Sequence, residues 1–440
     1  MKMVAGNITL FANHVEDSTV AFCESENISF ATFMGDVDVL TQKLLPLTGD
    51  VLISCESRYA FSVALLASWQ AGKVAILPPN KHTETLGEIG RAHKVAFVCN
   101  DVWAESCRQD NVSFSFTSTP LVFPCNQLAV RLYTSGSTGQ PKAVEKTMSN
   151  LLSEAEMLKN AFAWPNTAIV ASVPANHLYG LTFTVLLPWV LAVPLVDEMP
   201  LYASEVENCL EKNGSGILIT VPIHLKSLMD AGISLKKTMC VTSAAPLLKD
   251  TAQAYRQQYG TDPVEIYGSS ETGVIAHRRQ LQGESWETFS EVVVTSDAEG
   301  LLQVSSPFMN GQPSELFQMS DQVNMLDASR FTLEGRVDSI IKIGGKRIST
   351  LMIEQCLMRC HGVEDAAVIA VPAKSHIRDW VVWAAVAVDE NVHTNSRVIK
   401  RELQKWLDGI AIPRRIITLA KLSREENGKL PKKRLMALFE

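Results

Sequence analysis

Short apolar runs alternate with amphipathic stretches along the first two thirds of the chain. Val51–Cys55 has the composition of a strand, and Phe61–Ala71 is an apolar stretch of helical length that Gly72 ends. Val74–Leu77 begins the next predicted strand, which a pair of prolines terminates. Because strand and helix patterns follow one another in this way, the pattern predicts a layered α/β domain.

The strand pattern recurs further along this part of the chain, at 169–174, 216–222, 239–243 and 264–267. The most apolar stretch, Leu181–Val196, is sixteen residues long and contains two prolines. A membrane-spanning helix needs about 20 apolar residues, so this stretch predicts a buried helix or a pocket wall.

The pattern changes near Gly335. The residues that follow predict helices at 352–359 and 396–407 and strands at 366–371 and 380–388. We place a domain boundary at Asp338, which gives domains 1–338 and 339–440. The predicted fold is therefore α/β, with a large multilayer N-terminal domain and a small α+β C-terminal domain.

Composition is that of an ordinary globular protein, with 46% hydrophobic and 20% charged residues among 440. The net charge of −7 conceals an asymmetry, because residues 1–338 carry −14 and residues 339–440 carry +7. The basic C-terminal part is either a solvated surface or a surface for polyanions such as nucleotide phosphates, coenzyme A or an acidic carrier protein. Acids are interspersed and aromatics are few, which disfavours nucleic-acid binding.

Nine cysteines are scattered without a Cys-x-x-Cys spacing. Cys356, Cys360 and His361 come closest to a ligand cluster, but their apolar neighbours predict buried thiols rather than a zinc site. This usage suits a reducing compartment. The first residues lack the basic start and apolar run of a signal peptide, so we expect a cytoplasmic protein without a transmembrane segment.

The most distinctive segment is Tyr133–Lys142, which reads Tyr-Thr-Ser-Gly-Ser-Thr-Gly-Gln-Pro-Lys. Its glycines allow backbone N–H groups to surround an oxyanion, its hydroxyls add donors, and Lys142 adds a mobile charge. It is not a Walker loop, because Pro141 stands where that motif requires glycine. Such residues also make ordinary turns, but the apolar strand Leu128–Leu132 before the loop favours phosphate binding.

This loop resembles the signature of the adenylate-forming superfamily, which includes acyl- and aryl-CoA synthetases, luciferases and the adenylation domains of peptide synthetases. Five further segments resemble the other motifs of that family, in the family's order: Ile28–Phe33, Leu65–Gly72, Glu265–Gly273, Leu333–Ile348 and Asn427–Lys432. The resemblance covers essentially the whole chain and is most similar to compact acyl- and aryl-CoA synthetases. It implies a small C-terminal domain that is mobile.

The implied reaction begins with a carboxylate, which is a poor electrophile because attack must overcome its charge and resonance. Joining it to AMP creates a mixed anhydride with a good leaving group and releases pyrophosphate. Negative charge gathers on the α-phosphate in this step, so fixed cations and N–H donors placed there stabilise the transition state. The acyl group then passes to the thiol of CoA or of the 4'-phosphopantetheine on a carrier protein.

The resemblance assigns ATP contacts to particular residues. The residues implied to cradle the β- and γ-phosphates are Thr134, Ser135, Gly136, Ser137, Thr138, Gly139 and Lys142. Glu271 would hold Mg²⁺, which prefers hard oxygen ligands; the alternative is an exposed loop acid. Tyr267 would stack on adenine, beside Ala244 and Ser270, although a lone strand tyrosine also suits a core.

Asp321 resembles the acid that binds the ribose hydroxyls, with Arg336 as a second ribose or phosphate contact. Two segments depart from the family pattern. Met319-Ser320-Asp321 stands where Thr-Gly-Asp is usual, and Thr242–Pro246 has alanines where glycines are usual beside adenine.

Lys429 resembles the family's catalytic lysine, which bridges the substrate carboxylate and the α-phosphate. Gly428 before it allows close backbone packing that aims this one side chain, whereas the other basic residues nearby suit a solvated tail. Asp338 resembles the hinge residue, and Gly344 and Gly345 would line the thiol channel.

His177 is either a satisfied core histidine or the residue that closes the acyl tunnel. The predicted pocket walls are 176–187, 242–246 and 266–269, and bulky Tyr179, Leu181 and Phe183 suggest a small aryl or medium acyl substrate. Two functions stay open beside the ligase: adenylation with transfer by a partner, and a degenerate binding protein without catalysis. The intact site residues argue against the last.

Overall fold

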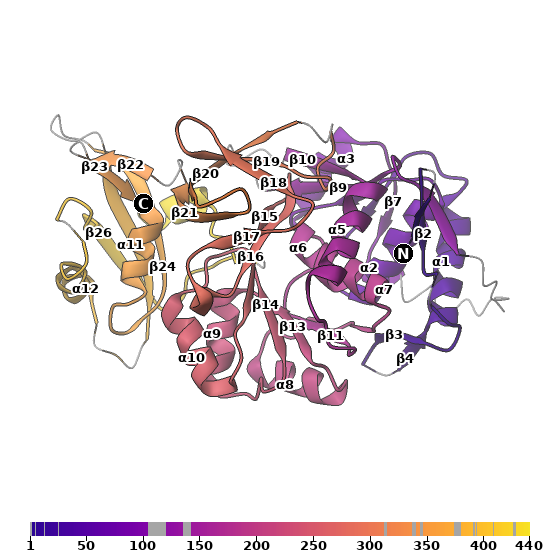
Figure 1. The fold of residues 1–440 in the computed structure, drawn as a ribbon, viewed down its shortest axis with the longest axis horizontal. Helices are drawn as coiled ribbons and strands as arrows, with labels where there is room; N and C mark the ends of the chain where they lie inside the picture. The colour runs from indigo at the N-terminus through magenta and orange to yellow at the C-terminus, as the bar shows by residue number, and fades with distance from the viewer. Residues whose placement is uncertain are drawn as a thin grey trace. The chain divides into compact units, whose positions relative to one another are not determined.

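The computed structural model describes residues 2–4, 6–12, 14–24, 26–103, 120–134, 142–311, 315–336, 340–343, 346–373, 380–389, 392, 394–407, 409–425 and 428–440. These residues form two compact units (Figure 1). The large unit is Met1–Val293 with Ser305–Leu316, and the small unit is Val294–Val304 with Phe317–Glu440. The predicted division into domains 1–338 and 339–440 stays a prediction, because 337–339 lie outside the described residues.

The main sheet of the large unit confirms the strands predicted between residues 169 and 267. Its strands are β3 (Thr19–Phe22), β4 (Asn27–Ser29), β11 (Ile169–Ala171), β12 (Leu195–Val196), β13 (Ile217–Thr220), β14 (Met239–Thr242), β15 (Val264–Ser269), β16 (Gly273–Arg278) and β17 (Trp286–Thr288). They are ordered β17-β16-β15-β14-β13-β11-β12-β3-β4. In this order the six neighbouring strands β15, β14, β13, β11, β12 and β3 run parallel to one another. β13 is buried throughout, as a strand covered on both faces should be.

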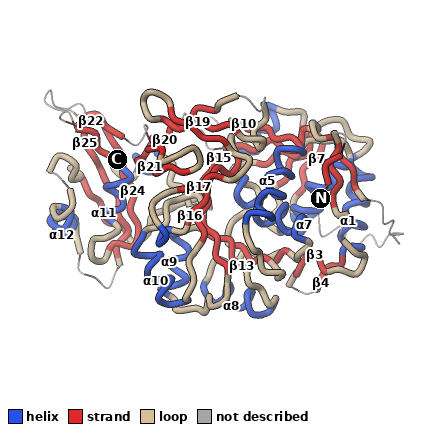
Figure 2. Tube along the Cα trace, in the orientation of Figure 1, coloured by secondary structure: helices blue, strands red, loops and turns tan. Residues whose placement is uncertain are grey.

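Three helices share an apolar core with this sheet: α8 (Ala203–Lys212), α9 (Pro222–Asp230) and α10 (Lys249–Tyr259). Leu228 and Tyr255 of the helices pack with Leu218 and Cys240 of the strands. Pro222 occupies the first turn of α9, where its missing N–H has no partner to lose. Figure 2 shows α9 and α10 side by side in this unit.

The apolar stretch Leu181–Val196 forms a broken buried helix, as predicted. It runs from the end of α6 (Leu178–Leu181) through a π-helical turn, η1 (Thr182–Leu186), and α7 (Leu187–Leu191) into β12. α5 (Met148–Ala161) packs against η1 and α7. Among the described residues no helix is both long and apolar enough to span a bilayer.

A second sheet in the large unit has the order β10-β9-β6-β5-β7, and a third is β1-β2-β8. The elements here are β1 (Lys2–Val4), β2 (Asn7–Leu10), α1 (Phe30–Leu44), β5 (Asp50–Ile53), α2 (Arg58–Gln70), β6 (Ala75–Leu77), α3 (Thr83–Ala92), β7 (Val95–Cys99), β8 (Leu121–Pro124), β9 (Leu128–Thr134) and β10 (Lys142–Thr147). The helix predicted from Phe61 begins at Arg58, because the Ser57 hydroxyl accepts from the Ala60 N–H and caps it.

Arg58 ties α2 to the main sheet, a role that the sequence pattern does not reveal. The side chain is buried, and burial lowers the pKa of its guanidinium to about 10. Its acceptors are the main-chain oxygens of Ala171, Val173, Val196 and Glu198 and the hydroxyl of Thr184. A buried charge with so many acceptors is satisfied, so Arg58 connects α2 to the main sheet without leaving a buried donor unpaired.

The small unit contains three groups of strands: β18-β19-β20-β21, the pair β22-β23, and β24-β25-β26. Its elements are β18 (Val293–Ser296), β19 (Leu301–Ser305), β20 (Phe317–Met325), β21 (Arg330–Arg336), β22 (Ile340–Ile343), β23 (Lys346–Ser349), α11 (Thr350–Leu357), β24 (Val363–Pro372), β25 (Trp380–Val388), α12 (Ser396–Leu403), β26 (Arg415–Leu419) and α13 (Lys432–Ala437). The predicted helices and strands after residue 350 are therefore confirmed.

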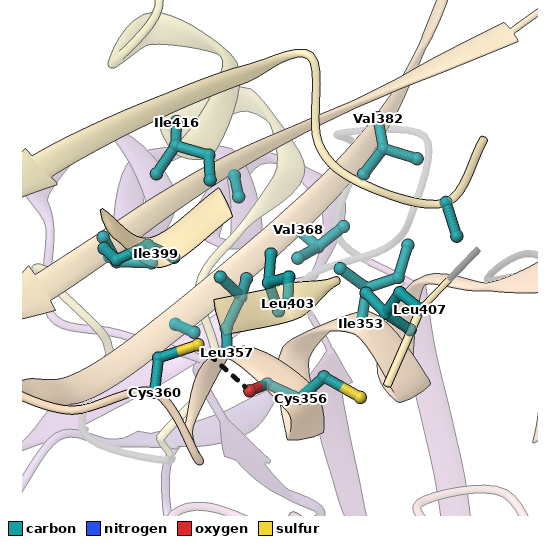
Figure 3. Close-up of a cluster of buried hydrophobic side chains, with 14 of the residues drawn as sticks. Ile353, Cys356, Leu357, Cys360, Val368, Val382, Ile399, Leu403, Leu407 and Ile416 are labelled. Carbon is teal, nitrogen blue, oxygen red and sulfur yellow. Dashed lines mark hydrogen bonds between the residues drawn. The ribbon is translucent and has the colours of Figure 1, made fainter. Parts of the chain in front are cut away.

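Helices α11 and α12 cover one face of the sheet β24-β25-β26 (Figure 3). Ile353 and Leu403 from the helices pack with Val368 and Val382 of the strands. The alternate residues of β24 pack instead with Leu435 and Phe439, at and beyond α13. Helices on both faces of this mixed sheet explain why β24 and β25 are largely apolar.

Cys356, on α11, and Cys360, just after this helix, are buried in the core of the small unit (Figure 3). The prediction of buried thiols is therefore confirmed. The Cys360 thiol donates to the Cys356 carbonyl oxygen at 3.5 Å. Burial raises the pKa of Cys360 to about 12. Such thiols carry little thiolate at neutral pH and are therefore poor nucleophiles.

Glu354 should make the stability of the small unit depend on pH. Burial raises the pKa of its carboxyl from 4.5 to about 7, with Arg424 opposing and Asp365 adding to this shift. Between these two values the folded state holds a proton that the unfolded state has lost, so stability falls as pH rises from about 4.5 to 7.

We expect Glu354→Gln to remove this loss and to gain on the order of 1–2 kcal/mol relative to the wild type at pH 8, and little at pH 4.5. Glutamine keeps the oxygen that accepts from the Val368 N–H. Thermal melts at both pH values measure the effect, with the exposed Glu364→Gln as control. Parallel pH curves for wild type and Glu354→Gln would contradict the prediction.

Candidate active site

The last part of β15 and the turn that leads to β16 carry three predicted site residues: Tyr267 lies on the strand, and Ser270 and Glu271 lie in the turn. A Cβ on Gly268 would lie 2.4 Å from the carbonyl oxygen of Gly273. Gly273 itself has φ +73°, and a Cβ there would lie 2.6 Å from Glu154 Oε1. Glycine is required at both ends of the turn, so the backbone that presents Glu271 follows one path.

Hydroxyl groups fix the interior of this turn. The Ser269 hydroxyl accepts from the Thr272 N–H at 3.1 Å and lies 3.0 Å from the Thr272 hydroxyl. The Glu271 side chain is half-buried, and its main-chain oxygen accepts from Lys146 Nζ at 2.7 Å. Glu271 is therefore held through its main-chain oxygen, and the residue is partly exposed.

The residues of this turn fit a magnesium ion that arrives with a nucleotide. In the described part of the chain no three His, Cys, Asp or Glu side chains are grouped so that they could hold a metal by themselves. Mg²⁺ is usually bound by one or two carboxylates together with substrate phosphates and waters. A single carboxylate, Glu271, among hydroxyl residues matches that donor set.

Tyr267 and the segment 242–246 lie next to each other at one end of the main sheet. The Ser243 hydroxyl donates to the Ile266 carbonyl oxygen at 2.8 Å, and the Leu247 N–H donates to Glu265 Oε1 at 2.8 Å. Burial raises the pKa of Glu265, which also binds Arg278 at 2.7 Å. These bonds hold the segment against β15, the strand that carries Tyr267.

Ala244 adopts the backbone conformation that glycine would give, with φ +72°. Alanine, which stands here where glycine is usual in the family pattern, therefore adopts a conformation that glycine reaches without steric cost. Thr242, two residues earlier, has a buried hydroxyl without a hydrogen-bond partner among the described residues. An unsatisfied buried hydroxyl costs free energy, so a partner supplied by a bound molecule would be favourable here.

Ala244→Gly should stabilise the large unit by about 1 kcal/mol, because a left-handed conformation is costly for alanine and not for glycine. Thermal unfolding measures the change. Ala245→Gly is the matched control, because φ of Ala245 is not left-handed and glycine there only adds freedom to the unfolded chain. Equal or lower stability of Ala244→Gly than of Ala245→Gly would contradict the strain at Ala244.

His177 lies directly before α6 and is half-buried. The Tyr179 hydroxyl lies 3.1 Å from the main-chain oxygens of Thr220 and of Val241, at the ends of β13 and β14. Burial raises the pKa of Tyr179 well above its ordinary value, so it stays neutral. Leu181 and Phe183 have no exposed surface and lie wholly in the core, so of the three bulky residues only Tyr179 could line a pocket.

Asp321 and Arg336 are brought together in the small unit. They stand opposite each other on the antiparallel strands β20 and β21. Arg336 Nη1 lies 3.4 Å from Asp321 Oδ2, and the Asp321 side chain is 9% exposed whereas that of Arg336 is 48% exposed. The pair thus combines a sheltered acid with a mobile cation, which suits contact with a polar ligand.

Lys429 is exposed and follows a tight turn in the small unit. Gly428 has φ +77°, its N–H donates to the Glu425 carbonyl oxygen, and the Glu425 N–H donates to that of Lys429. Arg424 donates to the Gly428 carbonyl oxygen at 3.2 Å and binds Asp365 through two 2.7 Å bonds. The backbone at Lys429 is therefore anchored to β24.

Several predicted residues lie outside the described part of the chain: Ser135, Gly136, Ser137, Thr138, Gly139, Asp338, Gly344 and Gly345. For Thr134 and Lys142 only the backbone is described, and these two residues are opposite each other in the register of β9 and β10. The ends of the predicted phosphate loop therefore meet.

Two buried charges that sequence reasoning missed adjoin the turn: Lys146 and Glu154, each 1% exposed. Both had a signal in the sequence. Lys146 is two residues after Val144 and therefore shares the buried face of β10 with it. Glu154 lies in the apolar stripe of α5 with Leu151 and Leu158. A charge at such a position predicts a buried, partnered group.

Comparisons with known proteins match both units. The family described as AMP-binding enzyme matches residues 91–294, and the AMP-binding enzyme C-terminal domain matches residues 352–429. A 4-coumarate–CoA ligase of Rhodobacter capsulatus is 30% identical over 238 residues, which are 53% of this chain and 58% of that protein.

A sulfoacetate–CoA ligase of Cupriavidus necator is 24% identical over 344 residues, or 70% of this chain and 66% of that protein. The match thus spans less than two thirds of either relative's length. The crystal structure of ATP-bound MatB from Rhodopseudomonas palustris has the same fold, with a TM-score of 0.81 at 18% identity, covering 96% of each chain. With both family domains present in the family's order, the chain belongs to the adenylate-forming, AMP-binding superfamily.

Proposed function

We propose that this protein activates a carboxylic acid with ATP and transfers the acyl group to a thiol. The first step makes acyl-AMP and pyrophosphate, and the second makes a thioester and AMP. The observation that carries the proposal is the turn after β15, where glycine is required on both sides of Glu271 and the turn follows the carboxyl end of a strand that runs parallel to β14. Ligand sites in open α/β sheets lie at such carboxyl ends.

The described residues supply distinct parts of the first step. Glu271 would hold Mg²⁺, whose positive charge offsets the negative charge of the phosphates. Tyr267, which is partly exposed, and the exposed Ala244 would contact adenine, and Asp321 with Arg336 would contact ribose. Lys429 supplies the mobile positive charge that stabilises the α-phosphate as pyrophosphate leaves.

CoA is the acceptor that we propose. The small unit is the basic part of the chain, and CoA carries phosphates that a basic surface attracts. Transfer to the phosphopantetheine of a carrier protein, or release of the adenylate to a partner enzyme, are the alternatives. Thioester assays with CoA and with a carrier protein, run in parallel, distinguish them.

An ATP–pyrophosphate exchange assay over aryl and fatty acids tests the first step. Exchange that depends on an acid establishes adenylation, and subsequent loss of free thiol from CoA establishes the ligase. No exchange with any acid, while ATP still binds, would favour the non-catalytic alternative. Binding can be followed by the rise in melting temperature that ATP produces.

Tyr179 should limit the length of the acid. Its ring is held by the contacts of its hydroxyl with the ends of β13 and β14. We therefore expect benzoate- or cinnamate-like acids to be activated faster than palmitate, and Tyr179→Ala to shift the ratio of kcat/KM toward longer acids by about tenfold. Phe183→Leu, which changes only the core, is the control. Equal activation of palmitate by the wild type would contradict this assignment.

A further inference from the structure

A buried network of hydrogen bonds connects the Glu271 turn to two other segments of the large unit. Lys146 Nζ donates to the main-chain oxygen of Glu271 at 2.7 Å and to that of Phe308 at 2.6 Å. Lys146 therefore binds the main chain of Glu271, the residue whose side chain is assigned to magnesium.

Glu154 holds the same turn from its other end. Its Oε1 accepts from the Val274 N–H at 2.6 Å, and its Oε2 accepts from the Thr182 hydroxyl at 3.0 Å. The carboxylate fits here because Gly273 has no Cβ, which would lie 2.6 Å from Glu154 Oε1. Because Thr182 opens the π-helical turn that follows Tyr179, one carboxylate is bonded to both the Glu271 turn and the helix assigned to the acid pocket.

Burying the charges of Lys146 and Glu154 costs desolvation free energy. An apolar pair of the same size would fill the core without that cost. Burial lowers the pKa of Lys146 to about 8 and raises that of Glu154. Three of the four hydrogen bonds of these two side chains go to backbone groups of the turn and its neighbours, and the fourth goes to the Thr182 hydroxyl. Their directional bonds specify a position, which apolar contacts do less sharply.

We propose that Lys146 is a positioning residue that sets the main chain of Glu271 so that its carboxylate meets the nucleotide-bound metal, with Glu154 as its buried counter-ion. The inference rests on the proposed function and extends it to residues that do not touch the substrates. It predicts that loss of the Lys146 bond weakens the response to Mg²⁺ while ATP still binds without metal.

Two double variants isolate this bond. Lys146→Met with Glu154→Gln removes both charges and the donor, whereas Lys146→Gln with Glu154→Gln removes both charges and keeps an amide donor for the carbonyls. The structural control is Asn150→Ala. Asn150 donates to the main-chain oxygens of Pro307 and Met309, which flank Phe308, and caps α5, but it does not bond the Glu271 turn.

Two readouts are measured for each folded variant. One is the rise in melting temperature caused by Mg²⁺ in the presence of an ATP analogue that cannot be cleaved between its α- and β-phosphates. The other is the Mg²⁺ concentration at half-maximal pyrophosphate exchange. We expect the Met pair to need about tenfold more Mg²⁺, on the scale of losing a group that orients a metal ligand. The Gln pair should stay near the wild type, and Asn150→Ala should lose stability with an unchanged Mg²⁺ response.

The same Mg²⁺ response in both pairs would overturn the assignment, and so would a shift of equal size in Asn150→Ala. Failure of both pairs to fold would make Lys146 a core residue instead. If the wild type itself shows no Mg²⁺-dependent stabilisation and no exchange, the proposed function fails, which is distinguishable from a wild type that responds normally beside unaffected variants.

Discussion

Lys429→Ala should lower adenylate formation by about 10²-fold or more, the usual scale for removing a positioned charge that stabilises a transition state. The same variant, given preformed acyl-adenylate and CoA, should make thioester at close to the wild-type rate. The reason is chemical: the α-phosphate gathers charge in the first half-reaction, whereas the second releases AMP from an anhydride already formed. Pyrophosphate release and thioester formation are measured separately.

Lys433→Ala is the matched control for this prediction. Lys433 is exposed on α13 and removing it changes the net charge equally, but nothing assigns it to the site, so both half-reactions should stay within about twofold. Asp338→Pro should show the opposite bias, because proline fixes φ where the proposed hinge must rotate. If folded Lys429→Ala lost both half-reactions equally, the separation of roles would be wrong for this protein.

Glu271→Gln should reduce adenylate formation by about 10²-fold at ordinary Mg²⁺ concentrations, and excess Mg²⁺ should partly restore it. Glutamine has nearly the shape of glutamate and keeps one oxygen, but it lacks the charge that attracts a divalent ion. The main-chain bond from Lys146 to residue 271 survives the substitution, because it uses the backbone oxygen. Activity is titrated with Mg²⁺ for both proteins.

Glu284→Gln, which removes an exposed acid of the large unit, is the control for general charge effects. Its titration curve should overlay that of the wild type. An unchanged curve for Glu271→Gln would remove Glu271 from the metal site and leave Mg²⁺ bound by phosphates alone. Lys146 would then have no metal ligand to position, although its hydrogen bond to the main chain of Glu271 would remain.

The sequence by itself determined the family, the layered fold and the identity of the strand end and turn that carry Tyr267, Ser270 and Glu271. These features are local. Glycines in a short segment permit a particular backbone, and apolar residues at strand or helix spacing form particular elements wherever they pack. The left-handed backbone of Ala244 was not visible, because alanine in that position contradicts the usual preference.

Only the tertiary structure decided which distant residues support that turn. Lys146, Glu154 and Phe308 are separated along the chain, and their hydrogen bonds exist only once β10, α5 and the main sheet have packed. The sequence showed polar residues on buried faces, but a buried charge needs its partner's position to be interpreted. The core placement of Leu181 and Phe183 has the same origin, because the sequence left open whether this apolar stretch is a buried helix or a pocket wall, and only the packing around it buries both side chains completely.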